Sequence, residues 1–342
     1  MELKIAASCC LCDDFLISEG WRDAPQCAMS AAEVMTAALT AAAFFSGSHE
    51  KSCVFLERHG YLPAMLSKSQ FSRRLRGIPE SVWRGLMSQP AAPFHESDSL
   101  RIYLADSFPV PACRNIRIRR CKTYQDECFR GRVSSRKEYF YGLKAHALMA
   151  ESGIPVEIFL SPGSYADVNA LYDFSFPVHS GSVIYGDRAC NACNIEDEIK
   201  RSNVDKNSKR KYEAFAEDGI KLIRKRIESA FSVIAQRFPA HIHAVTAQGF
   251  ELKIFLFVLA CGIEKTMMQV TTLVIERCTA AGNSIFYEPD HLVGIGEQYL
   301  DRLADHLAVL AGVLERIQED QQTDGGSPRM KILAFHCEWS RF

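Results

Sequence analysis

The feature of this 342-residue sequence that most restricts its fold is a change in the spacing of apolar residues near residue 95. Before that point apolar residues recur at helical spacing. After it, short apolar runs typical of strands are separated by helical segments. The segment Gln89–Pro93 (QPAAP) marks the boundary, because proline disfavours regular structure on both of its sides. Strands interleaved with helices predict an α/β layer rather than a β-sandwich.

Residues 1–95 are predicted to form a helical N-terminal domain. Ser30 and Glu33 (Ser-Ala-Ala-Glu) form a capping box, in which the hydroxyl and the carboxylate each accept from a free amide at the start of a helix. The alanine-rich run that follows should end at Ser46-Gly47. Further helices are predicted at His49–Arg58, Ser69–Arg76 and Glu80–Ser88.

Residues 96–266 are predicted to form the α/β body. The predicted strands are Leu100–Ala105, Tyr139–Ala150, Val156–Leu160 and Ser182–Tyr185, the second and third paired across the turn at Glu151–Pro155. The predicted helices are Val168–Phe174, Asn194–Arg201, Ile220–Arg237 and Phe250–Lys265. Residues 267–342 are expected to be a helical extension with a flexible tail. One amphipathic helix there carries leucines at alternating spacings of three and four between Leu300 and Ile317, as either a short dimer seam or a helix packed on its own body.

The net charge of −1 hides a strong segregation of charge. Residues 114–144 contain ten Lys or Arg against three acidic residues, and residues 200–226 contain ten against four. The net charges of +7 and +6 leave −14 for the rest of the chain. Two basic segments on an acidic body favour a polyanion such as nucleic acid as the partner. The N-terminal helices then suit either DNA binding or a packing or dimerisation layer.

The sequence argues against membrane, secreted and zinc-dependent classes. No apolar run reaches the roughly 20 residues of a membrane span, and the N-terminus does not resemble a secretory signal. The expected location is the cytoplasm. Thirteen cysteines are therefore expected to be reduced. Cys190 and Cys193 form a CxxC pair, but no second such pair stands at a zinc-finger distance from them.

Three carboxylates carry the candidate chemistry. Asp106 and Asp187 each follow a predicted strand directly, so both emerge at one edge of a sheet if those strands are neighbours. Glu228 lies beside the apolar stripe of the amphipathic segment Ile220–Phe231. Carboxylates on separate elements can hold two Mg²⁺ ions about 4 Å apart for an in-line displacement at phosphorus. Spacing alone does not single out this triple among 41 acidic residues.

The order of five motifs and the distances between them single out this triple. They are Asp106-Ser-Phe-Pro109, Tyr141-Gly-Leu-Lys144-Ala-His146, Leu160-Ser-Pro-Gly163 with Asp167, Tyr185-Gly-Asp187-Arg188 and Arg224-Lys-Arg-Ile-Glu228-Ser-Ala-Phe231-Ser232. Together they resemble bacterial insertion-sequence transposases of the DDE type, most closely insertion-sequence group nine-eighty-two. The resemblance covers about residues 8–264. Segments around Asp13-Asp14-Phe15 and Ser30–Met35 resemble the helical N-terminal part of the family.

The resemblance implies a ribonuclease-H-like mixed sheet flanked by helices, with Asp106, Asp187 and Glu228 as metal-binding D, D and E. It implies two Mg²⁺ or Mn²⁺ ions, cleavage at the ends of the element, and transfer of the freed 3′-hydroxyl into target DNA. The implied partners are double-stranded DNA, as terminal inverted repeats and target, and a second copy of the chain in a homodimer. The implied location is the bacterial cytoplasm, at the nucleoid when bound to DNA.

Several further residues are assigned to DNA or weighed as rivals to the triple. The predicted DNA contacts are Lys144, Arg188, Arg224, Arg226, Arg119 and Arg120. His146 shares a strand face with Lys144 and is expected to be a packed strand histidine rather than a catalyst. Asp167 is the rival third acid, although capping of the helix at Val168 also explains it.

The sequence departs from the family pattern in two regions. Many relatives carry a tyrosine and a lysine where this chain has Lys221 and Ala235, and the segment after Met267 has no counterpart in the family. Two alternatives therefore stay open. One is a structure-specific nuclease of the same fold, which cuts without joining, and the other is an inactive DNA-binding protein derived from a transposase.

Overall fold

The computed structural model describes residues 1–62, 64–91, 102–133, 137–177, 182–186, 205–206, 225 and 228–280. The chain divides into two compact units, Met1–Pro79 with Met267–Phe342, and Glu80–Thr266. The first division lies ahead of α5 (Glu80–Ser88), and so α5 belongs to the second unit rather than to an N-terminal unit that ends at residue 95. The second division falls after Thr266.

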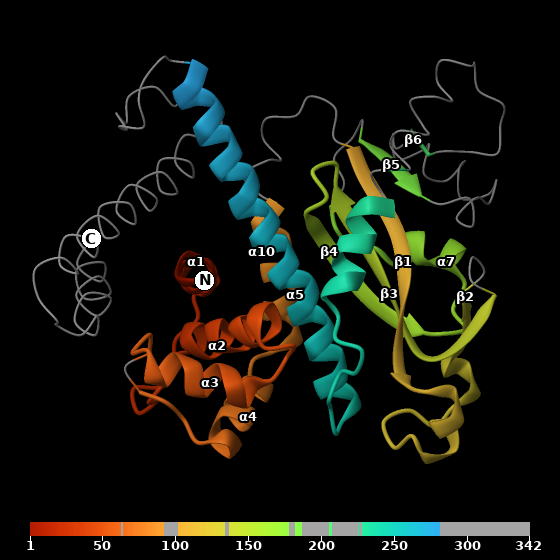
Figure 1. The fold of residues 1–342 in the computed structure, drawn as a ribbon, viewed down its shortest axis with the longest axis horizontal. Helices are drawn as coiled ribbons and strands as arrows, with labels where there is room; N and C mark the ends of the chain where they lie inside the picture. The colour runs from red at the N-terminus through yellow and green to blue at the C-terminus, as the bar shows by residue number, and fades with distance from the viewer. Residues whose placement is uncertain are drawn as a thin grey trace, which may run out of the picture. The chain divides into compact units, whose positions relative to one another are not determined.

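The first unit is built around a buried helix, α2 (Ala31–Phe44). Every residue of α2 from Ala31 to Ala42 is buried, and α1 (Glu2–Ser18), α3 (His49–Arg58) and α4 (Lys68–Arg76) pack against it (Figure 1). The small side chains of its alanine-rich sequence let three helices approach closely. The predicted helical character of this part of the chain is confirmed, and α3 has the predicted bounds.

The predicted capping box at the start of α2 is present. The Glu33 amide donates to Ser30 Oγ at 3.1 Å, and the Ser30 amide donates to Glu33 Oε2 at 2.7 Å. At the other end α2 stops before Ser46 and Gly47, which both have positive φ. Asp23 adds a second fixed point, because its carboxylate accepts from the Ala31 amide at 2.8 Å and pairs with Arg74 on α4.

The second unit is a mixed sheet with helices. Its elements after α5 are η1 (Gln89–Ala91), β1 (Ile102–Cys113), η2 (Asn115–Arg120), η3 (Glu127–Phe129), β2 (Arg130–Val133), β3 (Glu138–Ala150), β4 (Pro155–Pro162), α7 (Asp167–Asp173), β5 (Val183–Gly186) and β6 (Asp205–Lys206). A helix at 228–237 and α10 (Ala247–Ala280) follow. The predicted α/β class is confirmed. The predictions at Asn194–Arg201 and at Leu300–Ile317 lie outside the described residues.

The described strands form one sheet in the order β2-β3-β1-β5-β6, with β4 also paired to β3. The strand β3 runs antiparallel to β1, β2 and β4, whereas β1, β5 and β6 are parallel to one another. β2 and β4 follow each other along the same edge of β3, at Glu138–Tyr141 and Leu143–Met149. This mixed sheet is compatible with the ribonuclease-H-like fold that the resemblance implies.

The predicted end of the first strand at Asp106 is wrong. β1 continues to Cys113 and includes Pro109 and Pro111, which pair in register with Lys144 and Gly142 of β3. β1 pairs with β5 only from Ile102 to Ala105, and so beyond that point one edge of β1 has no partner strand among the described residues. A proline has no backbone N–H and cannot donate to a neighbouring strand. It is therefore tolerated where its nitrogen faces an edge without a partner strand.

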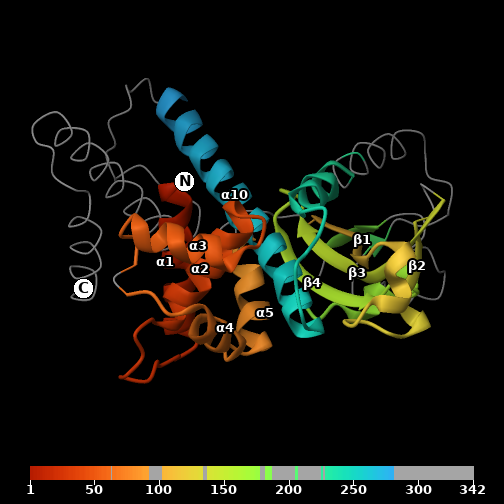
Figure 2. The same cartoon turned by 60° about the horizontal axis from the view of Figure 1, so that its bottom comes forward.

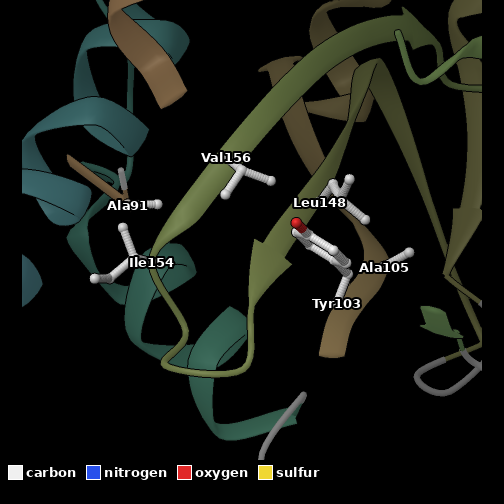
Figure 3. Packing of buried hydrophobic residues seen from close by; sticks show 6 residues of the cluster. All are labelled: Ala91, Tyr103, Ala105, Leu148, Ile154 and Val156. Atoms are coloured by element: carbon white, nitrogen blue, oxygen red, sulfur yellow. The ribbon is translucent and has the colours of Figure 1, made fainter. Parts of the chain in front are cut away.

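One face of the sheet is closed by an apolar cluster beside β1 and β3. Figure 3 shows Tyr103, Ala105 and Leu148 side by side, with Val156, Ile154 and Ala91 continuing the cluster. Tyr103 and Ala105 alternate with Leu104 and Asp106, so the side chains of Leu104 and Asp106 lie on the opposite face. The even-numbered residues of β1 therefore define one face of the sheet and the odd-numbered residues define the other.

α10 is longer than the predicted helix at Phe250–Lys265 and runs for 34 residues. Its first half is part of the second unit, where Gly262 lies against Pro155 and Thr266 Oγ1 donates to the Pro90 carbonyl at 2.7 Å. Within the described part of the chain, no helix combines the length and the apolar character needed to cross a membrane.

Three glycines allow close backbone approaches between β3 and β1, and between β2, β3 and the residue that follows β4. A Cβ at Gly142 would lie 2.3 Å from the Val110 carbonyl oxygen and 2.6 Å from the Ala112 nitrogen. A Cβ at Gly163 would lie 2.6 Å from the Phe129 carbonyl oxygen, and one at Gly131 would lie 2.4 Å from the Phe140 ring. The glycines of the motifs YGLK and LSPG are thus required by backbone contacts within the sheet.

We expect Gly142→Ala to lower the free energy of unfolding by about 2–4 kcal/mol, because backbone atoms of β1 cannot move away from the new methyl group without breaking the β1–β3 pairing. Urea denaturation measures the change. The matched control is Gly249→Ala in the first turn of α10, where the nearest atom is the Thr246 hydroxyl oxygen at 3.1 Å, and a small effect is expected. Equal stability of the two variants would contradict the close approach.

Candidate functional site

Asp106 lies on β1 one residue beyond the end of its parallel pairing with β5. Its side chain is half-buried, and its Oδ1 accepts from the Ser107 amide at 2.7 Å. The last register pair of the two strands is Ala105 with Gly186. Asp106 and Asp187 therefore each follow a member of this pair in the chain, and the prediction that their strands are neighbours is confirmed. Asp187 itself lies outside the described residues.

The face of β1 that carries Asp106 is covered by the helix at 228–237, drawn in teal over β1 in Figures 1 and 2. Phe108, two residues after Asp106 on the same face, contacts the ring of Phe231 at a centroid distance of 6.3 Å and that of Phe238 at 5.4 Å. Phe231 and Ile234 are buried, so this helix presents an apolar stripe to the sheet.

Glu228 lies three residues before Phe231 on this helix, and residues at that spacing share a side of a helix. Its side chain is exposed, beside the buried stripe, as the amphipathic pattern predicts. Asp106 and Glu228 thus flank the same aromatic contact, one from the sheet and one from the helix. The Arg237 guanidinium, at the end of the helix, pairs with Glu264 on α10 and holds the helix to the unit.

The opposite face of β1 carries a second group of polar residues, which the sequence did not predict to lie together. Asp167 Oδ1 accepts from Ser107 Oγ at 2.8 Å and from Lys144 Nζ at 3.1 Å. Lys144 Nζ also donates to the Tyr165 carbonyl at 2.8 Å. Both ends of the ion pair are shielded, with side chains 13% exposed for Lys144 and 30% for Asp167. We refer to Ser107, Lys144, His146 and Asp167 as the anchor cluster.

The anchor cluster changes the interpretation of two predicted residues. Asp167 is the first residue of α7, and Ala166 occupies the N-cap position that the capping interpretation gave to Asp167. Asp167 joins α7 to β1 and β3 instead. Lys144, predicted to contact DNA near the carboxylates, lies on the other face from Asp106 and is engaged by Asp167. A contact between Lys144 and DNA stays a prediction.

His146 is a packed strand histidine, as predicted. It is 2% exposed, its ring stacks on Phe159 at 4.7 Å, and its Nε2 lies 2.8 Å from Ser161 Oγ. Burial lowers its pKa from 6.5 to about 4, although the nearby Asp167 carboxylate acts in the opposite direction. The imidazole is therefore neutral near pH 7, which suits a buried position.

Two of the predicted DNA-contacting arginines are described, and both lie in the segment that follows β1. Arg119 and Arg120 are the last residues of η2 and are exposed. The other predicted DNA contacts, Arg188, Arg224 and Arg226, lie outside the described residues. No cluster of three His, Cys, Asp or Glu side chains suited to a metal occurs among the described residues. The cysteines among them, including Cys9, Cys10 and Cys12, are free thiols.

The family model described as the transposase DDE domain matches residues 96–235. This segment is similar to transposase DDE domains. The matched range begins just before β1, ends within the helix at 228–237, and includes Asp106, Asp187 and Glu228. No curated protein and no solved structure matches the chain.

The match supports a DDE-type transposase, which is a polynucleotidyl transferase that acts on DNA and generally uses divalent metal ions. A specific insertion-sequence group and a bacterial origin stay predictions. The anchor cluster had one signal in the sequence, the spacing of two between Lys144 and His146. Ser107, which lies opposite His146 on β1, could be identified only from the strand register.

We expect Asp167→Ala to lower the free energy of unfolding by about 2–3 kcal/mol, because it leaves the shielded Lys144 ammonium without a counter-charge. Thermal and urea denaturation measure the loss. Glu127→Ala, which breaks the exposed pair with Arg130, is the control and should have a much smaller effect on stability. The double variant Asp167→Ala/Lys144→Met should regain part of the stability, and an additive loss would contradict the role of the ion pair.

The lowered pKa of His146 predicts a specific pH dependence of stability. Between pH 6.5 and about pH 4 the unfolded chain binds a proton that the folded protein excludes. The contribution of the neutral His146 to the free energy of unfolding is thus fully present above pH 6.5. It is lost as the pH falls, at about 1.4 kcal/mol per pH unit. Unfolding free energies of the wild type and of His146→Gln, measured from pH 7 to pH 4, should converge by about 3 kcal/mol. Parallel curves would show that His146 titrates normally.

Proposed function

We propose that this chain is a DNA transposase that cleaves the ends of an insertion sequence and joins the freed 3′-hydroxyl to target DNA. Asp106, Asp187 and Glu228 are its proposed catalytic and metal-binding residues. The observation that carries the proposal is the register of β1 with β5, in which Ala105 pairs with Gly186. Each of the two aspartates directly follows one member of that pair.

The strand spacing makes this register informative. Neighbouring strands lie about 4.8 Å apart, and consecutive Cα atoms are about 3.8 Å apart. A carboxylate that follows Gly186 directly is therefore expected within side-chain reach of a metal ion bound to Asp106. Glu228 approaches the same face of the sheet, because Phe231 of its helix contacts Phe108. Two strands and one helix thus supply the proposed carboxylates.

The donor set fits divalent ions such as Mg²⁺ or Mn²⁺, which prefer carboxylate oxygen. When bound, two such ions lower the pKa of the attacking water or hydroxyl and stabilise the charge that develops on the leaving oxygen. The chain's own contribution is position and charge. The Ser107 amide orients Asp106 Oδ1, and the Arg237–Glu264 pair fixes the helix that carries Glu228.

The DNA in this proposal runs along the basic segments of the chain. Arg119 and Arg120 are exposed on η2 and support a contact with phosphates. Arg188, Arg224 and Arg226 are proposed to contact DNA from positions beside Asp187 and Glu228 in the sequence. Because two DNA ends must be brought together, a homodimer on DNA is part of the proposal.

The alternative functions differ in their products. A structure-specific nuclease of the same fold would cut DNA carrying the ends but would not join it to a target plasmid. An inactive DNA-binding protein would bind the ends and leave them uncut in either Mg²⁺ or Mn²⁺. The anchor cluster and the β1–β5 register support an intact catalytic fold, which favours an enzyme over the inactive DNA-binding protein. The match to the transposase DDE domain favours the transposase over the nuclease.

We expect Asp106→Asn, Asp187→Asn and Glu228→Gln each to reduce cleavage of DNA carrying the sequences that flank the gene by roughly 10²–10⁴-fold, since each removes a charged metal ligand. Binding of the same DNA should persist. Cleavage is measured on gels with Mg²⁺ and with Mn²⁺, and joining is measured with a target plasmid.

The matched control is Glu138→Gln on β3, an exposed carboxylate at the far end of the strand from the partners of Asp106. It should cleave normally. Wild-type cleavage by one of the three variants would remove that residue from the site. Binding without cleavage by the wild type would instead support the inactive DNA-binding protein.

A further inference from the structure

The segment between β1 and β3 forms a basic lobe, defined here as residues 114–133. It contains seven Lys or Arg against Asp126 and Glu127. Arg130 pairs with Glu127, and the Arg132 guanidinium lies over the Tyr139 ring at 5.8 Å. The remaining five cations are exposed and make no ion pair with any described residue. They are Arg114, Arg117, Arg119, Arg120 and Lys122.

The basic lobe is held in a fixed conformation by aromatic contacts at its base. Tyr124 is 5% exposed, packs on Phe129 at 4.5 Å and on Phe250 at 5.9 Å, and donates from its hydroxyl to Glu251 Oε1 at 3.1 Å. The Tyr141 hydroxyl donates to the Asp126 carbonyl at 2.9 Å. These contacts join the lobe to β3 and to the first turns of α10. The cations outside them are therefore presented on a supported surface.

Ile116 is the unusual member of the lobe. Its side chain is 91% exposed, and η2 places it among the five exposed cations. Asn115, its neighbour, is fixed by donation of its Nδ2 to the Tyr139 carbonyl at 2.8 Å. A single exposed aliphatic residue is common on protein surfaces. Here, however, any partner that covers Ile116 must also accept the surrounding positive charge.

A DNA duplex meets both requirements. Its phosphates complement the cations, and its stacked bases offer an apolar interior that an isoleucine side chain can enter. Proteins that bind the minor groove use arginines in this way and insert aliphatic wedges between base steps. An acidic protein surface would complement the charge but would not offer a stack of planar groups.

We propose that Ile116 inserts as a wedge between two base pairs from the minor groove, while the arginines around it bind the flanking phosphates. The inference rests on the proposed function only in taking DNA as the partner. It assigns to the basic lobe the unstacking of a base step, which bends the duplex and extends its contact with the protein. Pyrimidine–purine steps, which unstack most readily, are the expected position.

The test uses the full chain and a 30-base-pair duplex with 2-aminopurine at a central TA step, without divalent ions so that no cleavage occurs. Insertion unstacks the base and raises its fluorescence. Ile116→Ala should lose this rise and bind about tenfold more weakly, as expected for the loss of one buried aliphatic contact. Arg119→Ala should lower the slope of log affinity against log salt by about one unit.

Val245→Ala is the matched control, because Val245 is a 94% exposed aliphatic residue in a segment without Lys or Arg. It should preserve both the fluorescence rise and the affinity. Binding by the wild type without a rise, or a rise that persists in Ile116→Ala, would overturn the wedge. A change in oligomeric state of Ile116→Ala, with unchanged DNA signals, would overturn it in favour of a protein contact.

The result of the fluorescence experiment can be distinguished from the result of the cleavage experiment. A fluorescence rise that depends on Ile116 in a protein that neither cleaves nor joins DNA would leave the wedge in place and remove the transposase activity. Cleavage and joining with no fluorescence rise would do the reverse.

Discussion

The antiparallel pairing of β1 with β3 determines which side chains share a face of the sheet. It extends from Tyr103 to Cys113 and aligns Asp106 with Ala147 and Ser107 with His146. A shift of one residue would exchange the two faces and place Asp106 among the residues that contact α7. The register thus separates the proposed catalytic carboxylate from the anchor cluster, although the two are adjacent in sequence.

The two faces differ in what covers them. On the side of Asp106, the helix at 228–237 packs through Phe231 and leaves Glu228 exposed. On the other side, α7 is tied down by the Asp167 contacts, and the segment after α7 by the Ser175 and Phe176 amides, which donate to Glu157 at 2.9 and 2.8 Å. One face is therefore held by a polar network that is partly exposed, and the other carries the half-buried Asp106 and the exposed Glu228.

Local signals predicted the helices well, because their ends are set by side chains close in sequence. Ser30 with Glu33 and the bounds of α3 and α5 are examples. The course of β1 could not be predicted in the same way. Pro109 and Pro111 suggest the end of a strand, and only the short length of β5 explains why they are tolerated. The placement of Lys144 also depends on tertiary register, since its spacing from His146 gives a shared face but not which face. The role of Asp106 rests on its strand and its motif, and it stays a prediction.

The adjacency of Asp106 and Ser107 links the two faces mechanically. The Ser107 amide donates to Asp106 Oδ1, and its hydroxyl donates to Asp167 Oδ1 on the other side of the strand. A rotation of β1 about its axis that moved the Asp106 carboxylate would have to break the hydrogen bond between Ser107 and Asp167. Lys144 restrains Asp167 in turn, through an ion pair that is largely shielded from water. Asp167 can therefore limit the orientations open to the Asp106 carboxylate without contacting a substrate. Residues that hold a ligand or catalytic side chain in this way increase the precision of a site.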